Sequence, residues 1–129
     1  MFYAIVLDDD LDLRTVMTEV LLSIGIHDCI GVASEAAFRK LPVADVLRAD
    51  LIFLDVNLGP RVPSGIDAYR YLVDIGFKGL IYFFTGHAKS HPLVEEAARV
   101  TSSKVQILEK PIGLEAFVDI IEKVRKNHA

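Results

Sequence analysis

Leu51-Ile52-Phe53-Leu54-Asp55 decides the fold of this chain: four apolar residues run without interruption into a single carboxylate. The breakers Gly59 and Pro60 follow within five residues. A short, wholly apolar run bounded in this way is typical of a strand buried on both faces, at the centre of a parallel sheet. Open α/β sheets bind their ligands at the carboxyl ends of such strands. Asp55 is therefore a candidate site residue by its position.

Four further apolar segments predict strands of the same sheet: residues 3–7, 29–33, 80–84 and 105–108. Apolar residues recur at helical spacing in the segments near 11–24, 34–41, 65–74, 92–98 and 114–124. Pro42 breaks the second of these helices or restarts it. Five strands alternating with five helices predict parallel pairing through right-handed crossovers, so we expect an α/β three-layer sandwich.

Length and composition narrow the classes of protein. With 129 residues, we expect one domain, residues 1–129. The net charge of −4 argues against direct nucleic-acid binding, which needs a basic face. Cys29 is a single cysteine, so an internal disulfide is excluded and a reducing compartment is compatible. The apolar segment 2–7 is too short for a signal peptide or a membrane span, so we expect a cytoplasmic protein with no membrane association.

Polar side chains follow the strands of the predicted sheet. Asp8 and Asp9 come directly after the first strand, Asp55 ends the third, Thr85 ends the fourth and Lys110 follows the fifth. Because the carboxyl ends of parallel strands share one edge of the sheet, we expect these residues to converge. Three carboxylates within ~5 Å repel one another by ~3 kcal/mol per pair at an effective dielectric constant near 20. A cation is therefore expected among them, and hard oxygen donors favour Mg²⁺.

The remaining residues at this edge suit phosphate chemistry. Lys110 supplies a fixed positive charge that can contact a phosphoryl group. Thr85 offers a hydroxyl donor, and Gly86 lets backbone N–H groups approach closely. A carboxylate nucleophile, a divalent cation, a lysine and a hydroxyl together fit the formation of an aspartyl-phosphate.

Four sequence motifs, each at a strand end, carry a resemblance to a known family: Asp8-Asp9, Asp55-Val56-Asn57, Thr85-Gly86 and Lys110-Pro111. Over essentially its whole length the chain resembles the response regulator receiver domains of two-component signal transduction, in their single-domain, chemotaxis-regulator-like form. The resemblance implies a flavodoxin-like five-stranded parallel sheet of strand order 2-1-3-4-5.

The resemblance also implies roles for the acidic residues. Asp55 would be the phosphoacceptor, taking the group from a phosphohistidine on a sensor histidine kinase or a histidine phosphotransfer protein. Asp9, Asp55 and the backbone carbonyl of Asn57 would ligate Mg²⁺ directly, whereas Asp8 would act mostly through water.

The resemblance gives the other motif residues a part in switching. Lys110 would pair with the Asp55 carboxylate and then, together with Thr85 and Gly86, contact the phosphoryl group. The inward movement of the Thr85 hydroxyl would signal the phosphorylated state. The peptide bond before Pro111 is a candidate for the cis form.

Two features depart from the family pattern, and two further residues occupy positions that have a role in the family. Ile107 stands where the family usually has Tyr or Phe, whose ring moves together with the threonine. The loop 56–64 is about two residues longer than the family norm, and with Pro60, Arg61 and Pro63 we expect it to give the site an unusual lip and to alter partner docking. His87 and Lys89 occupy positions that tune dephosphorylation in the family.

We expect a phosphorylation-controlled switch that is not an enzyme, beyond assisting its own phosphorylation and dephosphorylation. A downstream protein target would read the face formed by the helix from Pro92, the strand 105–108 and the last helix, and a weak homodimer is a further expectation. Two alternatives stay open. Asp10-Leu11-Asp12 superficially resembles the Asp-x-Asp pair of haloacid-dehalogenase-like phosphatases, which suggests a Mg²⁺-dependent phosphohydrolase. Ile107 would instead suit a receiver-like interaction module that phosphorylation changes little.

Overall fold

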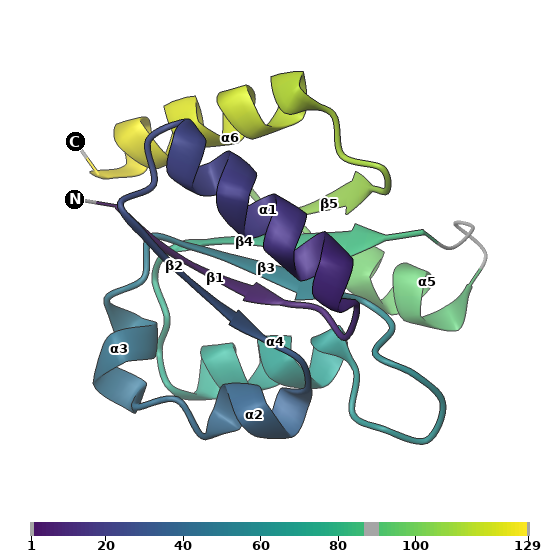
Figure 1. Ribbon diagram of the computed structural model, residues 1–129. Helices are drawn as coiled ribbons and strands as arrows, with labels where there is room; N and C mark the ends of the chain where they lie inside the picture. Colours follow the sequence, from purple (N-terminus) through teal and green to yellow (C-terminus); the bar gives the residue numbers. More distant parts are fainter. Residues whose placement is uncertain (1, 87–90, 129) are drawn as a thin grey trace.

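One parallel sheet forms the centre of the computed structural model, which describes residues 2–86 and 91–128. Its strands are β1 (Tyr3–Leu7), β2 (Asp28–Val32), β3 (Leu51–Asp55), β4 (Leu80–Thr85) and β5 (Val105–Glu109). Their order is β2-β1-β3-β4-β5 and every neighbouring pair is parallel (Figure 1). The predicted order 2-1-3-4-5 is confirmed.

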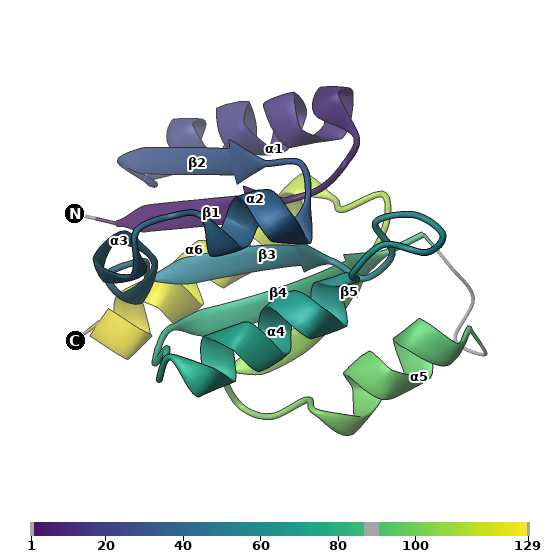
Figure 2. The same ribbon diagram turned by 90° about the horizontal axis from the view of Figure 1, so that it is seen from below.

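Helices cover both faces of this sheet. They are α1 (Leu11–Ser23), α2 (Glu35–Arg39), α3 (Val43–Leu47), α4 (Gly65–Asp74), α5 (Pro92–Arg99) and α6 (Leu114–His128). Helices α1 and α6 lie on one face, and α2, α3, α4 and α5 lie on the other (Figures 1 and 2). The three-layer α/β sandwich is confirmed. Among the described residues, none of the helices combines the length and the apolar character that a membrane span needs.

The predicted number of helices is wrong, because the described part of the chain has six where five were expected. The additional helix arises at Pro42, which divides the predicted segment 34–41 from a second short helix, α3. Pro42 has no backbone N–H to continue a helix, and its φ of −55° and ψ of 131° place it at the N-cap of α3. Proline therefore restarts the chain as a new helix here.

Alternate residues of a strand pack against the helices on opposite faces of the sheet. In β1, Ala4 and Val6 pack in the cluster that includes Met17 and Leu21 of α1, whereas Ile5 and Leu7 belong to the cluster beneath α2 and α4. All residues of β3 are buried, as the uninterrupted apolar run predicted. The three central strands β1, β3 and β4 are therefore buried on both faces, and they support the carboxyl ends of the sheet.

Strand register brings the carboxyl ends together. Leu7 of β1 pairs with Leu54 of β3, and Asp55 pairs with Phe84 of β4. At the next step across the sheet, Thr85 pairs with Glu109. The residues that follow β1 and β5 therefore emerge on either side of the Asp55 position.

Candidate functional site

Three carboxylates converge at this edge of the sheet. Asp8 directly follows β1 and is 0% exposed, Asp55 ends β3 and is 4% exposed, and Asp9 is open to solvent. One carboxylate oxygen from each residue lies within 4.8 Å of the others. The structure thus brings together the acidic residues that sequence analysis placed at one site.

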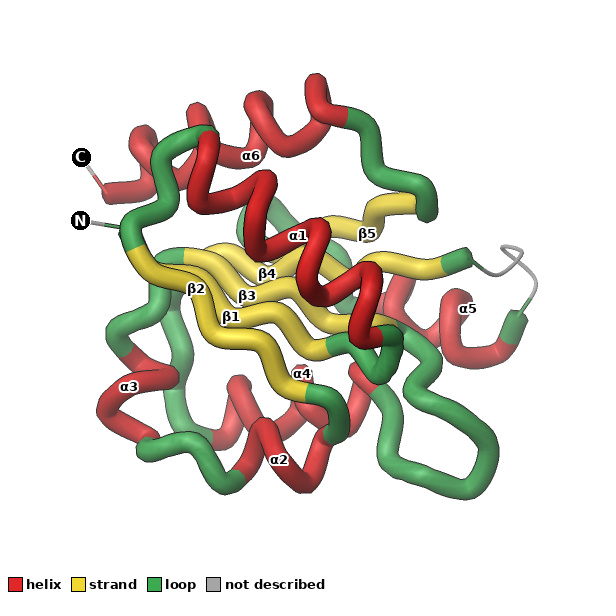
Figure 3. Tube along the Cα trace, in the orientation of Figure 1, coloured by secondary structure: helices red, strands yellow, loops and turns green. Residues whose placement is uncertain are grey.

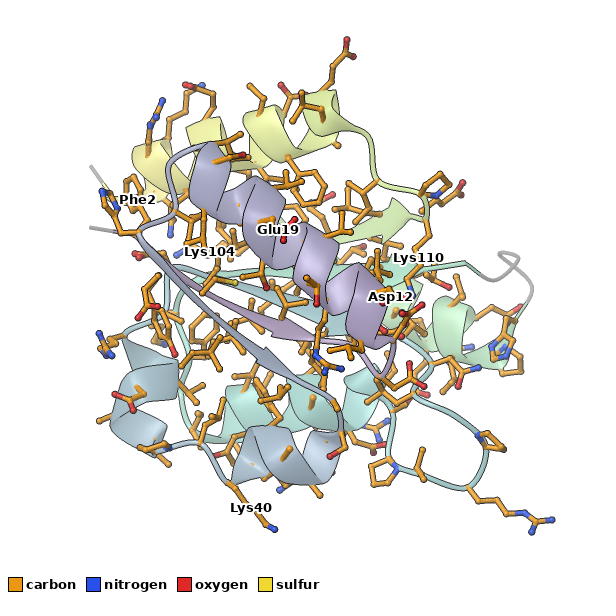
Figure 4. All side chains as sticks on the ribbon, in the orientation of Figure 1. Phe2, Asp12, Glu19, Lys40, Lys104 and Lys110 are labelled. Carbon is orange, nitrogen blue, oxygen red and sulfur yellow. The ribbon has the colours of Figure 1, made fainter. Side chains whose placement is uncertain are left out.

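A lysine side chain lies against two of these acids. Lys110 Nζ is 3.4 Å from Asp55 Oδ1 and 3.6 Å from Asp8 Oδ2. The same nitrogen lies 4.8 Å from the centre of the Phe84 ring, a distance at which a cation is attracted to the aromatic face. Figure 4 labels Lys110 at the edge of the sheet where α1 begins. Lys110 is therefore held beside the carboxylates from two directions.

The other predicted residues surround this cluster. Thr85, at the end of β4, is buried, and its carbonyl accepts a 2.8 Å hydrogen bond from the backbone N–H of Lys110. Gly86 follows directly and is exposed. The Asn57 N–H donates to Asp55 Oδ1 at 3.4 Å. The Lys110–Pro111 peptide bond is cis.

Burial, reinforced by the negative charge of Asp8, raises the pKa of Asp55 to about 7, while Lys110 opposes both effects. Burial also raises the pKa of Asp8, against the lowering effects of the Asp10 N–H and Lys110. Lys110 and the backbone N–H groups therefore offset only part of the cost of burying these two charges.

One carboxylate oxygen in this cluster is buried without a hydrogen bond from the described part of the chain. Asp8 Oδ2 is buried and finds no hydrogen-bond partner among the described residues. It lies in the same cluster of carboxylate oxygens, whose hard donors are those that Mg²⁺ prefers. The residues present therefore fit a divalent cation held by Asp8, Asp9 and Asp55.

One residue that supports this site was not predicted from the sequence. Gly65, read only as a helix start, packs so closely under Asp55 that a Cβ atom there would overlap the Asp55 carbonyl oxygen. Ser64 caps the same helix: its side chain accepts the Ile66 N–H, and its own N–H donates to Asp67 Oδ2 at 2.7 Å. The Ser-x-x-Asp spacing is a local signal for the cap, but nothing in the sequence shows what Gly65 contacts.

The Asp10-Leu11-Asp12 segment has a structural use. Asp10 is the N-cap of α1, where its Oδ1 accepts the N–H groups of Asp12 at 3.0 Å and Leu13 at 3.2 Å. Asp12 lies in the first turn of that helix. An Asp10 carboxylate occupied in capping does not favour the phosphohydrolase alternative.

Ile107 and the long loop after β3 depart from the family pattern, and the structure shows where each of them lies. Ile107 pairs with Phe83 and is half-buried beside a hollow of about 600 Å³, which Thr85, Val94 and Glu109 also line. The loop between β3 and α4 projects from the body of the molecule (Figure 3). His87 and Lys89 lie outside the described residues.

Comparison with known proteins gives a consistent picture of the fold. The sequence matches no protein-family model and no curated protein. Among solved structures, it is similar to a response regulator receiver domain protein from Clostridium thermocellum, with 17% identity, a TM-score of 0.82, and 99% of this chain and 97% of that chain covered. A response regulator receiver protein from Pseudoalteromonas atlantica has 19% identity and a TM-score of 0.81, and the match covers 98% of this chain and 99% of that chain. A response regulator receiver protein from Burkholderia phymatum has 25% identity and a TM-score of 0.76, and the match covers 96% of this chain and 94% of that chain.

Proposed function

We propose that this chain, which has the receiver-domain fold of two-component response regulators, is a signalling switch in which Asp55 accepts a phosphoryl group. The observation that carries the proposal is the position of Lys110 Nζ, 3.4 Å from Asp55 and 3.6 Å from Asp8 in a cluster of three carboxylates. A buried nucleophile with a fixed cation beside it, and with oxygen ligands for a second cation, is the arrangement that phosphoryl transfer needs.

The donor is a phosphohistidine on a sensor histidine kinase or a phosphotransfer protein. The bond between phosphorus and the imidazole nitrogen breaks as a bond forms between phosphorus and an oxygen of Asp55. Lys110 pairs with the carboxylate before transfer and with a phosphoryl oxygen after it. Mg²⁺, held by Asp8, Asp9 and Asp55 and by the Asn57 carbonyl, would supply the positive charge that lets the nucleophile be ionised and the phosphoryl charge be tolerated.

A groove beside Lys110 gives a donor protein a place to dock. It encloses about 220 Å³ between α1 and α6, and its lining is almost entirely apolar. Val16 of α1 is 54% exposed and Leu114 of α6 is 62% exposed, although both line this groove. Because Lys110 lines it too, a partner seated here would lie next to the acidic pocket. We therefore place the docking of the donor at this groove.

The charge that phosphorylation adds would cause the change that a partner protein reads. A phosphoryl group brings roughly −1.5 to −2 charges into the pocket. Thr85 lies beside Lys110 and also lines the hollow under α5, so a movement of its side chain would reach that helix. We propose that a protein target reads the face formed by α5, β5 and α6. The chain would assist its own phosphorylation and dephosphorylation and catalyse no other reaction, and we place it in the cytoplasm.

Labelling with a small phosphodonor tests the proposal. Acetyl phosphate and Mg²⁺ should phosphorylate the wild-type protein once, and Asp55→Asn should abolish the label. Asp12→Asn, an acid on α1 near the same edge, is the matched control and should label as the wild type does. Equal labelling of the Asp55→Asn variant would contradict the proposal. Multiple turnovers on phosphate esters would instead support the phosphohydrolase alternative.

A further inference from the structure

A second cation approaches the acidic loop from the side of α1. Arg14 Nη1 donates a 2.8 Å hydrogen bond to the backbone carbonyl oxygen of Asp8. The Asp8 residue is itself fully buried, and its Oδ1 accepts the N–H of Asp10 at 2.9 Å. Arg14 therefore contacts the main chain of the residue whose carboxylate enters the pocket.

The path of the Arg14 side chain depends on a glycine in the neighbouring strand. Gly31 of β2 leaves room that a Cβ atom would take, because that atom would lie 3.3 Å from Arg14 Cδ and 3.4 Å from Arg14 Cγ. The 3.3 Å contact is tighter than ordinary van der Waals packing, so a branched side chain at position 31 would displace the side chain of Arg14. The side chain of Arg14 thus lies over Gly31 on its way to Asp8.

The positive charge of Arg14 lies close to a site that we expect to bind a cation. A guanidinium next to a divalent-cation site repels the cation, and its charge alone would weaken metal binding. Its hydrogen bond goes to a backbone carbonyl, so it fixes the course of the chain at Asp8. The arginine thus gives the acidic loop a defined position at some electrostatic cost.

We infer that Arg14, seated over Gly31, is a positioning residue that holds the backbone of Asp8 so that the Asp8 and Asp9 carboxylates face a divalent cation. This inference rests on the proposed function, because it concerns the same pocket. Groups that orient metal ligands from outside the coordination sphere typically change metal affinity by about 10-fold to 100-fold when they are removed.

Mg²⁺ titration followed by backbone-amide NMR separates positioning from charge. Arg14→Gln removes the positive charge, so an electrostatic role predicts tighter Mg²⁺ binding, whereas positioning predicts about 10-fold weaker binding. Arg14→Lys keeps the charge without the planar fork and should restore part of the affinity. In the metal-free protein, the Asp10 N–H should exchange faster in Arg14→Gln than in the wild type.

Gly31→Val provides an independent variant that keeps the arginine but displaces it. We expect it to weaken Mg²⁺ binding as Arg14→Gln does, and the double variant to be no weaker than either single one, because the two act on one contact. Ala33→Val, an exposed site just beyond β2, is the matched control and should bind as the wild type does. Urea unfolding checks that each variant is folded.

Each outcome of the titration has one meaning. Arg14→Gln that binds Mg²⁺ as tightly as the wild type, or more tightly, overturns the inference and leaves the proposed function intact. Additive effects in the double variant overturn the role of Gly31 as the seat of Arg14. A wild-type protein that binds no Mg²⁺ overturns the proposed function, and the inference falls with it.

Discussion

At the scale of single residues, Asp55 is unusual because the fold disfavours the charged form of its carboxyl group. Burial and the nearby Asp8 raise its pKa to about 7, so the folded protein holds a proton there over a range in which the unfolded chain has lost it. Raising the pH from about 4 to about 7 therefore lowers the free energy of unfolding. A cation bound beside Asp55 would favour the charged form of this carboxyl and lower its pKa.

The first prediction for Asp55 concerns stability against pH in metal-free protein. Asp55→Asn removes the buried ionisation, so its free energy of unfolding should exceed that of the wild type by on the order of 3 kcal/mol near pH 8. The difference should shrink as the pH falls through about 4, because below that pH the wild-type carboxyl is protonated in both the folded and the unfolded state. Urea unfolding in a chelator across this range measures it.

Metal provides the control for this prediction. Saturating Mg²⁺ should stabilise the wild type at neutral pH more than it stabilises Asp55→Asn, because a ligand that binds only the folded state adds to its stability. A difference between the two proteins that is constant with pH would contradict the raised pKa of Asp55.

At the scale of elements, the junction of β3 and α4 controls the site. The N-terminus of α4 packs directly under Asp55, since Gly65 N–H donates to the Val56 carbonyl at 3.3 Å and Gly65 leaves no room for a side chain. The capping of α4 by Ser64 fixes the start of the helix at this point. The position of the Asp55 carboxylate thus depends on the contact between a strand end and a helix start.

Gly65→Ala should therefore damage both stability and function. A methyl group at this position would meet the backbone of Asp55, so we expect a loss of roughly 2–4 kcal/mol in the free energy of unfolding. Under conditions where the variant is still folded, labelling by acetyl phosphate should be slower than in the wild type. Gly113→Ala is the matched control, because a Cβ there would meet nothing within 4 Å. Equal effects of the two substitutions would show that the contact with Asp55 is unimportant.

At the scale of the whole molecule, α5 is the element best placed to respond to the pocket. It is joined to α4 by an ion pair between Glu96 and Arg70. On its sheet side it faces the hollow of about 600 Å³ next to Thr85 and Ile107. An aliphatic residue at position 107 offers no ring to fill this space, so we expect a response to phosphorylation to travel through Thr85 and α5.

Beryllofluoride, a phosphoryl mimic, tests this response without a kinase. With Mg²⁺ it should shift backbone-amide NMR signals in α5 and β5 of the wild-type protein, and Asp55→Asn should show no such shifts. Changes confined to the pocket, with binding demonstrated, would instead favour the interaction module that phosphorylation changes little. Changes confined to α2 and α3 would contradict the proposed readout face.

Much of this protein is determined by local sequence. The apolar run Leu51–Leu54 suffices to predict a central strand, because burial on both faces leaves no position for a polar residue. With parallel strands, the acids after β1 and β3 and the lysine after β5 had to reach one edge, so the candidate site could be predicted as well. Pro42 could be recognised as a breaker, but whether it ended a helix or began another was open.

Tertiary structure alone decided which atoms meet across elements. Gly65 under Asp55, Arg14 over Gly31 and the hollow beside Ile107 all join segments that are distant in sequence. No periodicity or motif records such contacts, because each depends on the packing of helices against the sheet at close to crystal density. The sequence therefore determined what chemistry this chain carries, and the packing determined how its groups are held in place.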